Sequence, residues 1–144
     1  MTFSERILPI GEWIFAVLGA AICVGAVIEF APLQAVRLWP APGIYFLELI
    51  VLAILVLISR VMDASPGKMD YGAIPWIAGG ALFAFSILAV FSIGLYIFPA
   101  AVAYFLAAIL GDIRHRGSIR KHLVFSLVAA VCQVGLVGLF LLLN

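Results

Sequence analysis

The chain has 144 residues, of which 67% are hydrophobic and 10% are charged, and its formal net charge is +1. Average soluble domains contain about 25% charged residues and about 45–50% apolar ones. This composition therefore excludes an ordinary soluble globular protein and predicts an integral membrane protein. We expect no nucleic-acid partner.

The apolar runs are continuous, as in LELIVLAILVLIS at residues 47–59. Such runs predict helices, because the strands of a membrane barrel would alternate polar and apolar residues. The expected fold is an all-α bundle with five transmembrane helices in a single membrane domain, residues 1–144. A span needs about 20 apolar residues. The first, second and last spans are predicted at about 10–30, 43–60 and 122–143, and we expect the first to be retained because it is longer than the apolar core of a signal peptide.

The run at 73–110 contains no charged residue. A single helix of that length would extend about 57 Å, whereas the hydrocarbon core of a bilayer is about 30 Å thick. Two spans are therefore predicted, at about 73–93 and 97–113. We expect Gly94 to end the first of them in a left-handed conformation and Pro99 to lie in the first turn of the second.

The basic residues indicate the orientation. With five spans, only Arg37 falls on one side of the membrane, and the other lysines and arginines fall on the opposite side: Arg6, Arg60, Lys68, Arg114, Arg116, Arg120 and Lys121. Because positive charge accumulates in cytoplasmic loops, the N-terminus is predicted to be cytoplasmic and the C-terminus outside. The expected location is the cytoplasmic (inner) membrane.

The fourth predicted loop is compact and basic. Its side chains are expected to contact anionic lipid headgroups, or alternatively to dock a cytoplasmic partner; they are Arg114, Arg116, Arg120 and Lys121. His115 and His122 flank the same loop at the surface end of two spans. Axial ligands of a haem would lie on facing helices within the bundle, so we expect no haem, metal or other cofactor.

Three charged residues are predicted near the outer side of the membrane: Glu29, Arg37 and Glu48. Carboxylates inside a bilayer are costly and usually face a partner or water. A cluster of these three residues is therefore feasible. It would serve either as a polar clasp between helices or as a proton or cation site, and the sequence leaves both interpretations open.

Small and polar residues indicate helix packing. Ala103, Ala107 and Gly111 recur every four residues, a spacing that lets helices approach closely, and Gln133 near mid-membrane is expected to hydrogen-bond across a helix interface. These features predict packing within the chain, self-association, or contact with other membrane proteins.

No catalytic signature is present. Cys23 and Cys132 lie in apolar spans and do not form a CxxC pair. A membrane-embedded enzyme acting on lipid usually gathers polar residues at one depth, and we do not expect such a group here. We therefore predict that the protein is not an enzyme. Two hypotheses remain: a non-catalytic accessory or assembly subunit of a larger membrane complex, and a small oligomeric transporter or channel that uses Glu48 and Glu29.

The orientation is directly testable. A topology reporter fused after Asn144 is expected to be active outside the cytoplasm, because an odd number of spans separates the two termini. The same reporter placed before Met1 serves as the control and is expected to report a cytoplasmic location. A cytoplasmic signal from the C-terminal fusion would contradict the five-span assignment.

Overall fold

The computed structural model describes residues 3–34, 41–63, 71–90, 93–115 and 118–143. These residues form five helices and no strand, which confirms the predicted all-α bundle. The helices are α1 (Phe3–Gln34), α2 (Ala41–Asp63), α3 (Ala73–Leu88), α4 (Gly94–His115) and α5 (Ile119–Leu143).

Four of the helices are long and apolar enough to cross a membrane, with candidate spans at Ile7–Phe30, Gly43–Asp63, Gly94–His115 and Ile119–Leu139. The fifth, α3, is also apolar but has only 16 residues. At about 1.5 Å per residue it extends about 24 Å, somewhat less than the hydrocarbon core. The protein is therefore a multi-pass membrane protein, and the side on which each terminus lies stays a prediction.

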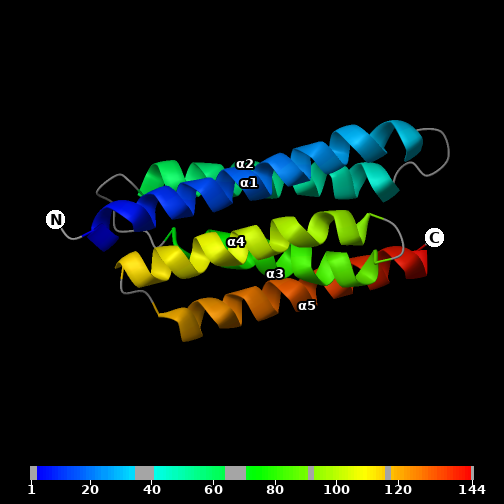
Figure 1. Ribbon diagram of the computed structural model, residues 1–144. Coiled ribbons are helices and arrows are strands. Elements are labelled where there is room, and N and C mark those ends of the chain that lie inside the picture. Colours follow the sequence, from blue (N-terminus) through cyan, green and yellow to red (C-terminus); the bar gives the residue numbers. More distant parts are fainter. Residues whose placement is uncertain (1–2, 35–40, 64–70, 91–92, 116–117, 144) are drawn as a thin grey trace.

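Successive helices run in opposite directions, so that α1 begins and α5 finishes at opposite ends of the bundle (Figure 1). Helix α1 packs against α2 and α4, and α3 packs against α4, α5 and, less extensively, α2. Helices α3 and α4 thus occupy the middle of the bundle, while α5 lies at its edge. We call the end at which α1, α3 and α5 begin the inner end, because the basic residues predict that it faces the cytoplasm.

The turn between α3 and α4 differs from the sequence prediction. Helix α3 finishes at Leu88 rather than near residue 93, and α4 begins at Gly94 rather than residue 97, so Pro99 lies inside the helix instead of in its first turn. Gly94 does not adopt the left-handed conformation that we expected. Its N–H donates to the carbonyl of Ala89 at 2.8 Å. A Cβ atom here would collide with the Ser86 carbonyl, so this position requires glycine for close approach.

The core between α1 and α4 is built from small residues around one large side chain. Tyr104 of α4 is fully buried, and its hydroxyl lies 4.0 Å from the Sγ atom of Cys23 in α1. Gly19 lies against the Tyr104 ring so closely that a Cβ atom would overlap it. Packing at this distance gains dispersion energy, which holds helices together in lipid where the hydrophobic effect does not.

Helices α3 and α5 also approach closely at a glycine. A Cβ atom on Gly80 would collide with the backbone carbonyl and the Oγ atom of Ser126 in α5. The backbone of α5 cannot move aside as a flexible side chain could. The contact between the two helices therefore depends on the absence of a side chain at this position.

Gly80→Ala is expected to lower the free energy of unfolding by about 1–3 kcal/mol, because the new methyl group must push α5 away from α3. The matched control is Gly135→Ala in α5, where a Cβ atom would meet nothing within 4 Å. The control is expected to leave stability unchanged or slightly raised. Thermal unfolding of both variants in the same detergent tests this, and equal midpoints would contradict the described α3–α5 contact.

Candidate functional site

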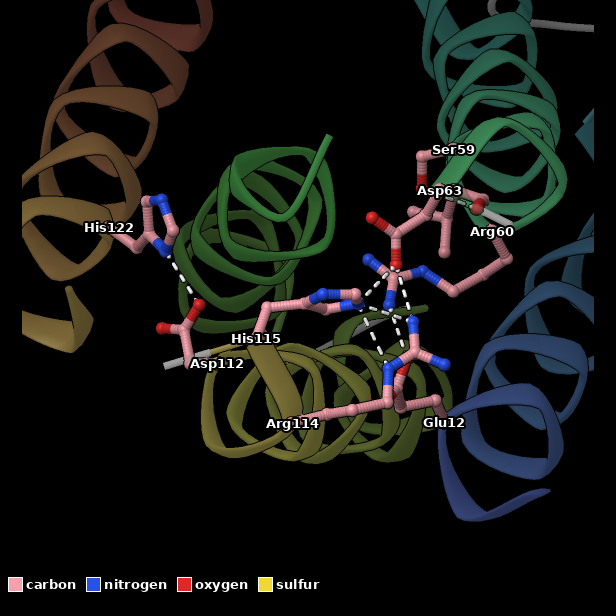
Figure 2. Close-up of polar contacts among 9 residues, drawn as sticks. Glu12, Ser59, Arg60, Asp63, Asp112, Arg114, His115 and His122 are labelled. Atoms are coloured by element: carbon pink, nitrogen blue, oxygen red, sulfur yellow. Dashed lines mark hydrogen bonds and ion pairs between the residues drawn. The ribbon is translucent and has the colours of Figure 1, made fainter. Parts of the chain in front are cut away.

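Polar side chains from all five helices gather at the inner end of the bundle. They come from α1 (Glu12), α2 (Arg60 and Asp63), α3 (Trp76), α4 (Asp112, Arg114 and His115) and α5 (His122). Figure 2 shows those of α1, α2, α4 and α5. The polar side chains form two groups: one joins α4 to α1 and α2, and the other joins α4 to α3 and α5.

The first group, which we call the ionic cluster, consists of Glu12, Arg60, Asp63, Arg114 and His115. One oxygen of Glu12 lies 2.9 Å from Nη1 of Arg60, and the other lies 3.1 Å from Nε of Arg114. Arg114 also donates to Asp63 at 2.6 Å, and Nε2 of His115 lies 3.0 Å from the same Asp63 oxygen. The cluster therefore joins α1, α2 and α4 through two arginines and two carboxylates, whose formal charges balance.

Burial differs strongly within the ionic cluster. The side chains of Glu12 and Arg60 are each 2% exposed, whereas those of Arg114 and His115 are 26% and 50% exposed. Breaking a buried ion pair by removing one partner is strongly destabilising, because a charge is left without compensation. Glu12 is therefore the residue whose loss would affect the cluster most.

Arg60 is only partly satisfied. Its Nη1 atom bonds Glu12, but Nε and Nη2 are buried and have no hydrogen-bond partner within the described part of the chain. A buried donor without a partner costs about 1–3 kcal/mol. Gly111 of α4 makes room for this guanidinium, since a Cβ atom there would lie 3.1 Å from Nη1.

The second group joins α3, α4 and α5. Nδ1 of His122 lies 2.7 Å from one oxygen of Asp112, and Nε1 of Trp76 donates to the other oxygen at 3.1 Å. The side chains of Asp112 and His122 are each only 2% exposed. Both oxygens of a buried carboxylate are thus satisfied, and α5 is attached to the middle of the bundle at its inner end.

A third polar contact lies deeper in the membrane. Gln133 of α5 donates directly to Glu48 of α2 at 3.0 Å. Glu48 is half-buried, and among the described residues no cationic side chain pairs with it. This contact links two helices that otherwise lie on different sides of the bundle.

The predicted cluster of Glu29, Arg37 and Glu48 is only partly visible. Glu29 is exposed on α1 and has no hydrogen bond or ion pair with Glu48, and Arg37 lies outside the described residues. The structure instead brings Glu48 together with Gln133, the residue for which the sequence predicted a contact across an interface. The three-residue cluster stays a prediction.

The basic residues of the fourth loop lie in different surroundings. Arg114 belongs to the ionic cluster, Arg120 and Lys121 are exposed on α5, and Arg116 lies outside the described residues. Lys121 lies 5.7 Å from the centroid of the Phe125 ring. Lipid contact by these residues is still an expectation.

The predicted packing residues of α4, namely Ala103, Ala107 and Gly111, are all buried. Polar residues gather at the inner ends of the helices: Glu12, Arg60 and Arg114 meet in the ionic cluster, and Asp112 belongs to the second group. A signal was available, because the predicted spans place all four near the inner ends of their helices. Comparing depths across spans, rather than motifs along the chain, would have indicated this site.

Comparison with known proteins found no matching protein family, no matching curated protein and no matching solved structure. Within the part of the chain that the structure describes, no group of three or more His, Cys, Asp or Glu side chains is placed to hold a metal ion. The site is therefore interpreted from its own geometry.

Glu12→Gln is expected to lower the free energy of unfolding by about 3 kcal/mol, because two guanidinium groups lose their shared carboxylate. Glu29→Gln is the matched control, since it makes the same change at an exposed position of the same helix. Unfolding in detergent would measure both. Similar stability of the two variants would show that the ionic cluster contributes little.

Proposed function

We propose that this protein is a non-catalytic accessory or assembly subunit of a larger membrane complex. The observation that carries the proposal is that the buried ionisable side chains pair with one another between helices. Glu12 pairs with Arg60, and Asp112 pairs with His122, in each case between two different helices of the chain. These groups hold the bundle together, which favours a structural role over a catalytic one.

The outer surface of α5 supports a packing role. Its described buried polar side chains (His122, Ser126 and Gln133) all belong to one helix face, and the rest of the helix is largely apolar and exposed. A Cβ atom on Gly135 or Gly138 would meet nothing within 4 Å. Glycines on an exposed membrane helix let another helix approach closely. We therefore infer that this part of α5 packs against a neighbouring membrane protein.

The exposed residues Arg120 and Lys121 adjoin the predicted cytoplasmic surface. Basic side chains next to a membrane attract anionic headgroups, by about 1 kcal/mol each. In the proposed complex they anchor the inner end of α5 at the lipid surface, and we expect that the protein works in the cytoplasmic membrane.

A second candidate is a small oligomeric transporter or channel. The observation that favours it is the half-buried carboxylate of Glu48, whose partner is the neutral side chain of Gln133 and which pairs with no cation among the residues that the structure describes. Such a group can exchange a proton or a cation more readily than a carboxylate held between two arginines. This role requires a homo-oligomer, because five short helices enclose little volume.

The two candidates are separated by extracting the protein gently from its native membrane and identifying bound proteins by native mass spectrometry. The accessory role predicts a defined set of larger membrane proteins, which Gly135→Leu would release. Ala21→Leu, the same kind of enlargement at an exposed position of α1, is the control and is expected to retain them. The transporter role predicts a homo-oligomer alone, with ion flux in proteoliposomes that Glu48→Gln abolishes.

A further inference from the structure

The guanidinium group of Arg60 has one edge that the protein leaves unused. Nε and Nη2 lie on the same side of the planar group and donate in nearly parallel directions. Both are buried and have no partner among the described residues, while Nη1 bonds Glu12. The unused atoms are therefore the pair of donors with which arginine binds two oxygens of one carboxylate or phosphate.

The contact with Glu12 does not by itself require an arginine. A single N–H···O bond at 2.9 Å could equally be donated by a lysine ammonium, which has no second, fixed pair of donors. An arginine at this position therefore fits recognition of a second acceptor group in addition to Glu12.

The depth of Arg60 fits an acceptor group from the membrane surface. Arg60 lies in the last turn of α2, which ends at Asp63, and Arg114 and His115 lie in the last turn of α4. These helix ends belong to the inner boundary of the predicted spans, where phosphate groups of the lipid headgroups are found. The more exposed members of the ionic cluster, Arg114 and His115, lie near Arg60 at this end of the bundle (Figure 2).

We propose that Arg60, supported by Arg114, binds one oxyanion of the phosphate class at the inner end of the bundle. Two oxygens of the anion accept hydrogen bonds from Nε and Nη2 of Arg60, the two buried donors of this guanidinium group. Glu12 and Asp63 balance the two arginines in the free protein, and His115 can add a positive charge when it is protonated. The anion is the phosphate of a lipid headgroup or free inorganic phosphate, and the site does not depend on the accessory role proposed above.

Arg60→Lys is the decisive variant, because it keeps the positive charge opposite Glu12 and removes the paired donors. Binding of dioleoyl phosphatidylglycerol to the detergent-solubilised protein is measured by native mass spectrometry. We expect the first lipid to bind the variant about tenfold more weakly than the wild type, as for the loss of one charge-assisted contact. Dioleoylglycerol, which lacks the phosphate, is expected to bind both proteins equally.

The control variant is Tyr96→Phe, which removes one hydrogen-bond donor at an exposed position in the first turn of α4, at the opposite end of the bundle, and is expected to bind the phospholipid as the wild type does. Thermal unfolding of the wild type in inorganic phosphate or in chloride of equal ionic strength identifies the source of the anion. A higher unfolding temperature in phosphate than in chloride supports the site with free phosphate as its ligand. Phospholipid binding with no such stabilisation by phosphate supports the site with a lipid headgroup as its ligand. The proposal would be overturned if wild type and Arg60→Lys bound the phospholipid equally and the wild type unfolded equally in the two salts. The comparison of salts uses only the wild type, so it remains informative even if the variant does not fold.

Discussion

The contact of Glu12 with two arginines is the interaction on which the bundle depends most. Its carboxylate lies between guanidinium groups from α2 and α4, so it fixes three helices at one depth. Apolar side chains gain little by moving from lipid to a helix interface, and association in a membrane relies on close packing and polar contacts. A single charge in a bilayer is costly, but a charge that meets its partner determines which helices become neighbours.

Helix α4 connects this contact to the rest of the molecule. Asp112 and Arg114 are two positions apart, and residues with this spacing lie on opposite sides of a helix. Arg114 accordingly meets α1 and α2, and Asp112 meets α3 and α5. A single turn of one helix thus holds the two halves of the bundle, and the buried small residues of α4 bring its backbone close to both.

The helices could be predicted from the sequence because hydropathy and length are properties of a segment by itself. Their ends were less predictable: α3 finishes at Leu88 because backbone contacts around Ala89 and Gly94 close the turn early, and such contacts leave no mark in the hydropathy. The pairing of charges was not predicted, because it depends on how each helix is rotated about its axis. Gln133 was expected to cross an interface, but its partner Glu48 became apparent only when α2 and α5 were placed in space.

The polar inward side of α5 has a consequence for biogenesis. Helix α5 must find partners for His122 and Gln133, and these partners lie on α4 and α2, which are synthesised before it. Until then, two polar side chains are presented to lipid on a helix that is otherwise apolar. Docking of α5 therefore follows the synthesis of α2 and α4, and a chain in which it fails exposes polar groups within the membrane that quality-control proteases can recognise.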